Sequence, residues 1–221
     1  WNALIKLGTS KVGGMVILSI VEVPIGLAVV AFANPIDPAA VPWVLAAGCT
    51  HFAYKFFLTY AYDRGDLSRV YPIARGAAPM VVALVGAVFL ADAVTGREYL
   101  AIAVLAAGIL LMARGVFTSG EDRKLLPFAL GSALATATYT LIDGMGARVS
   151  GSPAAYVAWV FVADGTFFTL GMLALRGWGV IPRDWHAWRM GAFASVASYG
   201  AYAVSIWAMT LAPIAVVAAL R

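Results

Sequence analysis

Apolar segments of about twenty residues dominate the chain and constrain its fold more than any other feature. A helix that crosses a bilayer, whose hydrocarbon core is roughly 30 Å thick, needs a segment of about that length. Hydrophobic residues make up 62% of the chain and charged residues 12%, and the mean hydropathy is +0.88. A water-soluble domain carries far fewer apolar side chains. The sequence therefore predicts an all-helical membrane protein with several membrane-spanning helices.

Short polar breaks divide the apolar segments into seven complete predicted spans. They lie near residues 12–32, 43–62, 70–90, 99–116, 126–146, 154–175 and 188–210. The opening WNALIKLG is typical of the end of an earlier helix, and the closing APIAVVAALR is typical of the start of a later one. We therefore expect the chain to belong to a longer protein, with an incomplete helix at each end.

Basic residues alternate between the two sides of the predicted membrane. Alternate loops place two of them, Arg97 and Arg148, on one side and ten on the other: Lys6, Lys11, Arg64, Arg69, Arg114, Arg123, Lys124, Arg176, Arg183 and Arg189. Cytoplasmic loops carry the excess of positive charge, so the loops 114–124 and 176–189 are predicted to be cytoplasmic. The basic residues lie between spans rather than on one exposed face, which argues against a nucleic-acid partner.

Motifs for catalysis, nucleotide binding and metal binding are missing from the sequence. It contains no HExxH, no Gly-x-Ser-x-Gly and no glycine-rich phosphate loop, and its single cysteine, Cys49, lies within an apolar segment. We therefore predict that the protein is not an enzyme and uses no cofactor and no metal. Two alternatives stay open: a membrane-embedded transferase with Asp143 and His51 as an acid/base pair, and a channel.

Ionisable residues inside the predicted spans are the strongest indication of a site. An Asp, Lys or Arg at the centre of a membrane helix costs about 2.5–3.5 kcal/mol even on lenient insertion scales, so such residues face a cavity or a partner. The candidates are Glu22, His51, Lys55, Arg75, Asp143, Asp164 and Arg221. An alternative interpretation is that they form buried ion pairs that only fix the packing of the helices.

Helical spacing places several of these residues on polar faces. In the 43–62 span, His51, Tyr54 and Lys55 follow the i, i+3, i+4 rule and share one face. The same rule groups a second set in the 126–146 span, Thr136, Tyr139, Thr140 and Asp143. Neither polar face is suited to contact with lipid, so both are predicted to face the interior of the bundle.

Arg75 lies within the segment GDLSRVYPIARGAAP, in which Pro72 and Pro79 remove backbone donors. Tyr71 lies four residues earlier on the same helical face. A guanidinium beside such an irregularity suits bidentate binding of a carboxylate or phosphate in a water-accessible cavity. The alternative is an interfacial arginine whose charged end reaches the membrane surface.

A weak internal repeat relates the two parts of the chain. A shift of 147 positions aligns residues 43–75 with residues 190–221, with matches such as Ala47 on Ala194 and Val70 on Val217. An odd number of helices separates the two copies, so they would have inverted topologies, as in many secondary transporters.

Four segments together resemble the EamA-type transporters of the drug/metabolite transporter superfamily. In chain order they are WNALIK, AYDRGDLSRVYPIARGAAP, TYTLIDGMGARVSG and APIAVVAALR, and GDLSRVYPIARG is the most specific part of them. The resemblance implies ten helices in two inverted five-helix repeats. Residues 1–116 would then form the first repeat, with its first helix incomplete, and residues 117–221 the second, without its last helices. Members of the family are usually drawn with both termini in the cytoplasm, whereas the basic loops of this chain place them outside.

The resemblance also implies a central substrate cavity lined by the first, third, fourth, sixth, eighth and ninth helices. The candidate substrate-binding residues on those helices are Trp1, Asn2, His51, Tyr54, Tyr71, Arg75, Tyr139, Asp143, Tyr199 and Arg221. Tyr202 and Trp207 would add aromatic walls to it. Glu22 and Asp164 lie on the second and seventh helices, where they are either structural or proton-coupling carboxylates.

The predicted function is secondary active or facilitated transport of a small metabolite, such as an amino acid, by alternating access. Export is what the resemblance implies. The alternative is efflux of cationic drugs, for which Glu22 and Asp164 would supply the negative charge. We expect a multi-pass protein of the bacterial inner membrane, a monomer or homodimer, whose partners are the lipid bilayer, the small-molecule substrate and a proton as the candidate coupling ion.

Overall fold

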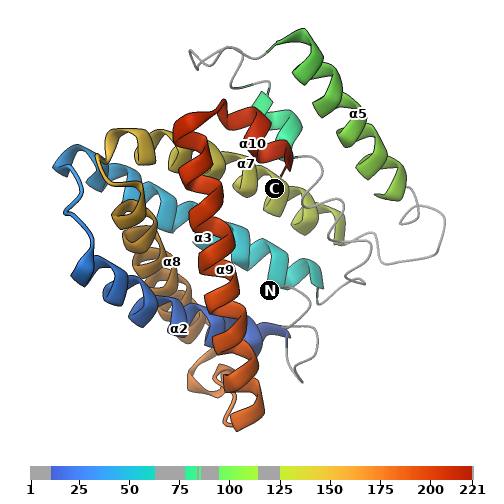
Figure 1. Ribbon diagram of the computed structural model, residues 1–221. Coiled ribbons are helices and arrows are strands. Elements are labelled where there is room, and N and C mark those ends of the chain that lie inside the picture. Colours follow the sequence, from blue (N-terminus) through green and yellow to red (C-terminus); the bar gives the residue numbers. More distant parts are fainter. Residues whose placement is uncertain (1–10, 63–77, 84, 86–94, 114–124, 221) are drawn as a thin grey trace.

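The computed structural model describes residues 11–62, 78–83, 85, 95–113 and 125–220. Within these ranges all regular structure is helical, and none of these residues lies in a strand (Figure 1). The elements in chain order are α2 (Lys11–Phe32), η1 (Pro38–Ala40), α3 (Val41–Tyr62), α5 (Gly96–Ala113), α7 (Leu125–Val149), α8 (Pro153–Arg176), η2 (Trp178–Val180), α9 (Trp185–Leu211) and α10 (Ile214–Leu220). The predicted all-helical fold is confirmed for this part of the chain.

Helices occupy six of the seven predicted spans, with ends that differ by a few residues from the prediction. The remaining predicted span, near 70–90, falls mostly outside the described residues, although residues 78–83 are helical. The closing apolar segment forms α10, as its composition predicts. The opening segment WNALIKLG lies outside the described residues.

Capping residues define the ends of α8 and α9. Pro153 begins α8, where its missing N–H has no intrahelical acceptor to bond, and Gly177 ends it with a φ of 70°, which favours glycine. Asp184 begins α9, because its carboxylate accepts a hydrogen bond from the Ala187 amide at 2.9 Å. The turn between the two helices is therefore fixed by local sequence.

Arg148 joins the end of α7 to the end of α9. Pro213 has no N–H to donate to the Met209 carbonyl four residues earlier. The Arg148 Nε group donates to that oxygen at 3.0 Å, and its Nη2 group donates to the Ala212 carbonyl at 3.1 Å. One arginine thus satisfies backbone acceptors at the break between α9 and α10.

Three helices are long and apolar enough to cross a membrane: Val12–Phe32 of α2, α8 and α9. Helices α3 and α7, with 22 and 25 residues, are not among these three. They carry the polar faces that contain His51, Lys55 and Asp143. The described part of the chain is therefore that of a membrane protein with at least three helices of spanning character.

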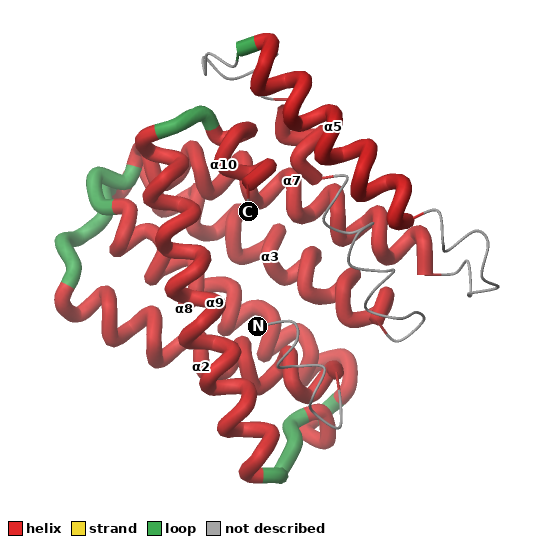
Figure 2. The backbone as a smooth tube through the Cα atoms, turned by 45° about the vertical axis from the view of Figure 1, so that its right-hand side comes forward, coloured by secondary structure: helices red, strands yellow, loops and turns green. Residues whose placement is uncertain are grey.

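The helices pack as two pairs joined face to face. Helix α3 lies along α7, and α2 lies along α8, as Figure 1 and Figure 2 both show. Helix α3 also packs on α8, and α9 packs on α2 and contacts α7 and α8. Helix α5 lies at the periphery beside α10. The interior is therefore enclosed by α2, α3, α7, α8 and α9.

Glycines allow α2 and α8 to approach each other closely. A Cβ atom on Gly26 of α2 would lie 2.6 Å from the Ala158 carbonyl oxygen of α8. A Cβ atom on Gly165 of α8 would in turn collide with the Ser19 carbonyl oxygen of α2. These backbone atoms have little freedom to move away, so small residues at both points set the distance between the two helices.

We predict that Gly165→Ala lowers the stability of the protein, whereas Gly200→Ala on α9 does not. Gly165 faces the α2 backbone, and nothing lies within 4 Å of a Cβ added at Gly200. Overpacking of this kind typically costs about 1–3 kcal/mol, while Gly-to-Ala replacement in a helix is otherwise favourable. Thermal unfolding in detergent should show a lower midpoint for the first variant only. Equal midpoints would contradict the close approach of α2 and α8.

Candidate functional site

Asp143 of α7 is fully buried, and three other helices contact its carboxylate. The Nε2 atom of His51, on α3, lies 2.8 Å from Oδ2, and the Tyr202 hydroxyl of α9 donates to the same oxygen. The Tyr156 hydroxyl of α8 donates to Oδ1 at 3.2 Å. Asp143 therefore joins α3, α7, α8 and α9 through one carboxylate; we call these four residues the Asp143 cluster.

Aromatic rings surround the imidazole of the Asp143 cluster. The Tyr139 ring stacks on His51 with a centroid distance of 4.1 Å and an angle of 23°. Tyr54 meets the edge of Tyr139 at 5.4 Å, and Tyr202 meets the edge of His51 at the same distance. The cluster thus combines one carboxylate with an imidazole and several phenol rings, which suits a ligand with both polar and apolar parts.

The hydroxyls of the α7 polar face are bonded within their own helix. Thr136 Oγ1 donates to the Ser132 carbonyl at 2.8 Å, and Thr140 Oγ1 donates to the Thr136 carbonyl at 2.7 Å. Such back-bonding removes the hydroxyl proton from other use. On the same face of α7, Tyr139 and Asp143 both contact His51 of α3.

A second polar cluster lies one helical turn along α3. The Lys55 ammonium contacts Glu22 Oε2 of α2 at 2.5 Å and Asp164 Oδ2 of α8 at 2.7 Å. It also donates to Ser19 Oγ at 2.9 Å. The three charged residues are each at most 3% exposed. We call Lys55, Glu22 and Asp164 the Lys55 cluster.

One oxygen atom of the Lys55 cluster has no hydrogen-bond partner in the described part of the chain. Asp164 Oδ1 is buried and unpaired, whereas Oδ2 of the same carboxylate contacts Lys55. Phe168 lies one turn further along α8, with its ring centroid 5.7 Å from the ammonium. An unpaired carboxylate oxygen in apolar surroundings is costly, so this atom is a natural acceptor for a proton or a donor group.

The structure brings together seven of the predicted candidates in two groups. His51, Tyr139 and Asp143 lie together with Tyr54 beside them, while Glu22 and Asp164 lie together around Lys55. Tyr199 is half-buried and meets the edge of Phe161 at 5.0 Å. Trp207 is 58% exposed. The predicted site residues Trp1, Asn2, Tyr71, Arg75 and Arg221 lie outside the described residues.

Sequence reasoning missed the role of Tyr156 and the direct bond from Tyr202 to Asp143. Tyr202 follows Tyr199 by three residues, and this spacing predicts a shared face but no partner. Tyr156 lies in the first turn of α8, where no polar neighbour in the sequence sets it apart. The residue that could have indicated this contact is Gly146 of α7, because the Tyr156 ring packs where a side chain at position 146 would lie.

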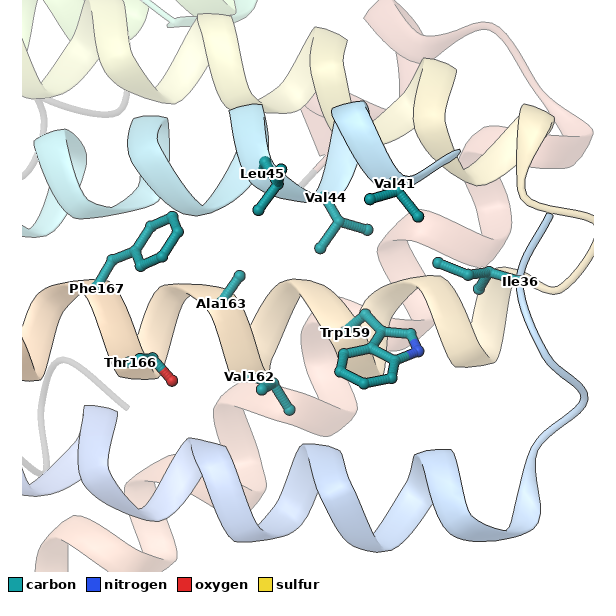
Figure 3. A pocket seen from close by; sticks show the side chains of 9 residues that line it. All are labelled: Ile36, Val41, Val44, Leu45, Trp159, Val162, Ala163, Thr166 and Phe167. Carbon is teal, nitrogen blue, oxygen red and sulfur yellow. The ribbon is translucent and has the colours of Figure 1, made fainter. Parts of the chain in front are cut away.

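An apolar pocket of about 480 Å³ lies between α3 and α8, apart from both clusters (Figure 3). Helix α3 contributes Val41, Val44 and Leu45, and Ile36 closes the end near η1. The part that α8 contributes consists of Trp159, Val162, Ala163, Thr166 and Phe167. With one hydroxyl in its lining, the pocket suits hydrocarbon rather than a polar metabolite.

Among the residues that the structure describes, no group of three or more His, Cys, Asp and Glu side chains could hold a metal ion. Comparison of the sequence with protein-family models, curated proteins and solved structures gives no match.

We predict that Asp143→Ala destabilises the protein more than Tyr156→Phe does. The first change removes the acceptor that His51, Tyr156 and Tyr202 share, and a buried polar group left unpaired costs about 1–3 kcal/mol. The second removes one hydroxyl, and a single hydrogen bond is worth about 0.5–1.5 kcal/mol. Thermal unfolding of the two variants, compared with Tyr99→Phe on the peripheral α5, would measure the difference. A larger effect of Tyr156→Phe would contradict the central position of Asp143.

Proposed function

We propose that the protein is a secondary transporter that moves a small amphipathic metabolite by alternating access. The observation that carries the proposal is the Asp143 cluster, a polar and aromatic group that joins α3 to α7, α8 and α9 inside an apolar helical bundle. Buried polar groups in membrane helices are costly and commonly mark a substrate or ion pathway. The resemblance to EamA-type transporters supports the same class of function.

Reciprocal packing supports two inverted repeats. Helix α3 packs on α8 as α9 packs on α2, and α2 and α8 face each other. Gly26 of α2 contacts the backbone of α8, and Gly165 of α8 contacts the backbone of α2. An exchange of α2 with α8 and of α3 with α9 preserves these contacts, as a two-fold axis between the repeats would. Alternating access would then be a rocking of one five-helix half against the other.

The chemistry of the site favours an amino acid or a related metabolite. The rings of Tyr139 and Tyr202 would hold an apolar body, and the imidazole and phenol groups would bind polar substituents. Arg75 and Arg221 would bind an anionic group, as the sequence predicts for them. Asp143 already accepts from three side chains, so its main role would be to orient His51 and Tyr202 toward the substrate.

Efflux of cationic compounds is the second candidate. The Lys55 cluster favours it, because its two carboxylates face one ammonium, and Asp164 Oδ1 has no partner among the residues that the structure describes. A cation that displaced Lys55 would find two carboxylates already in place. The transporter would in either case be a multi-pass protein of the inner membrane.

A counterflow assay tests the proposed function. Full-length protein in proteoliposomes loaded with an unlabelled amino-acid mixture should take up the radiolabelled mixture, and uptake should saturate. Arg75→Ala and Tyr202→Phe should reduce the rate at least tenfold because each removes a substrate contact, while Trp207→Phe, on an exposed face, should retain it.

Three outcomes would contradict the proposal. Unaltered uptake by folded Arg75→Ala and Tyr202→Phe proteins would remove the site from transport. Conductance without saturation would indicate a channel, and conversion of the substrate in detergent would indicate an enzyme. Saturable uptake of a cationic drug that is unaffected by Arg75→Ala would favour the second candidate.

A further inference from the structure

We propose that Glu22 and Asp164 together bind one exchangeable proton, and that the Lys55 cluster is the proton-coupling site of the transporter. The coupling role rests on the proposed function, whereas proton binding does not. Two carboxylates and one ammonium carry a net charge of −1 when all three are ionised. Each of these residues is at least 97% buried, so an unbalanced charge there would be strongly unfavourable. One proton makes the cluster neutral.

The contacts of the ammonium show why both carboxylates cannot be satisfied as anions. An ammonium has three protons to donate, and Ser19 Oγ, Glu22 Oε2 and Asp164 Oδ2 lie at 2.9, 2.5 and 2.7 Å. None is left for Asp164 Oδ1, which has no other partner in the described ranges. When two carboxylates share one site and one counter-charge, the ionisation of one disfavours that of the other, and the proton they retain belongs to the pair.

The charges that face the cluster come from three helices. Helix α2 supplies Glu22, α3 supplies Lys55, and α8 supplies Asp164. Helix α9 also packs on α2, and its charged residues are Arg189, which is exposed, and His186, in its first turn. On α7, Asp143 is bonded to His51, Tyr156 and Tyr202. Among the described residues, the ion pairs of Lys55 are those with Glu22 and Asp164.

Helix α3 connects this proton site to the proposed substrate site. His51 and Lys55 are four residues apart on one face, so a shift or rotation of α3 moves both groups together. A substrate that draws His51 away from Asp143 would thereby weaken the contacts of Lys55 with the two carboxylates. Substrate binding at His51 and proton binding at the carboxylates would thereby affect each other, which is the coupling that a proton-linked transporter needs.

Infrared spectroscopy of the full-length protein in detergent tests proton binding without any substrate. The wild-type protein should show the C=O stretch of one protonated carboxyl group that disappears as the pH is raised. Glu22→Gln and Asp164→Asn should each remove this band, because the remaining carboxylate then pairs with Lys55 alone. Lys55→Met should retain it, and Glu98→Gln, in the first turn of the peripheral α5, serves as the matched control that leaves it unchanged.

Several results would overturn the proposal. One is a wild-type spectrum with no band that depends on either carboxylate, and another is a band that survives in folded Asp164→Asn or folded Glu22→Gln protein. Isotopic labelling of the wild-type protein keeps the test decisive if the variants do not fold. Carboxyl-¹³C aspartate and carboxyl-¹³C glutamate should each shift part of the band. A band that shifts with neither label would refute a shared proton. So would a band that shifts with labelled aspartate alone and disappears in the Asp143→Asn protein.

Proteoliposomes test the coupling role with the same radiolabelled amino-acid mixture. A pH gradient should drive accumulation by the wild-type protein, whereas Glu22→Gln and Asp164→Asn should retain counterflow and accumulate nothing above equilibrium. Accumulation by both variants would refute coupling at this site. Absence of counterflow in the wild-type protein would instead contradict the proposed function, and the infrared result would still decide whether the pair holds a proton.

Discussion

The contact of one ammonium with carboxylates from two other helices is the interaction on which the interior of this protein depends. Lys55 brings α2, α3 and α8 to a common point, and the apolar contacts between these three helices have no fixed direction. Apolar packing alone would tolerate a helix that slid or rotated by part of a turn. A charge in an apolar interior does not, because loss of its partner leaves it uncompensated. The ion pairs therefore set the register of the three helices.

The Asp143 cluster serves the same purpose at the other helices. It ties α7, α8 and α9 to α3, so α3 and α8 take part in both clusters. Apolar side chains pack around the two clusters: Met15, Leu18 and Leu58 belong to one hydrophobic group, and Val160 and Ile206 to another. The bundle thus contains a polar path across several helices, enclosed by side chains that exclude water.

The sequence predicted the helices and their polar faces, but not how those faces meet. Twenty-residue apolar segments and 3.6-residue periodicity fix the helices and place His51 with Lys55, and Tyr139 with Asp143, because both are local properties. Which helix faces which is set by tertiary packing, and sequence spacing within one helix carries no information on it. This explains why Lys55 was a candidate without an assigned partner, and why the bond from Tyr156 to Asp143 was missed. Arg75 and Arg221 lie outside the described residues, so their positions stay predictions.

The close approach of α2 and α8 at Gly26 and Gly165 has a mechanical consequence. In the rocking that we propose for the two halves, displacement would be smallest where their backbones are in contact and would grow with distance from that point. Glu22 lies one turn before Gly26, and Asp164 is adjacent to Gly165, so the paired carboxylates lie almost on the fulcrum. A small rearrangement there, such as gain of a proton, would be amplified at the far ends of the helices. The carboxylates lie close to the contact point of α2 and α8, and the helix ends at the membrane surfaces lie far from it. A movement of a fraction of an ångström at the carboxylates would therefore open one side of the bundle and close the other.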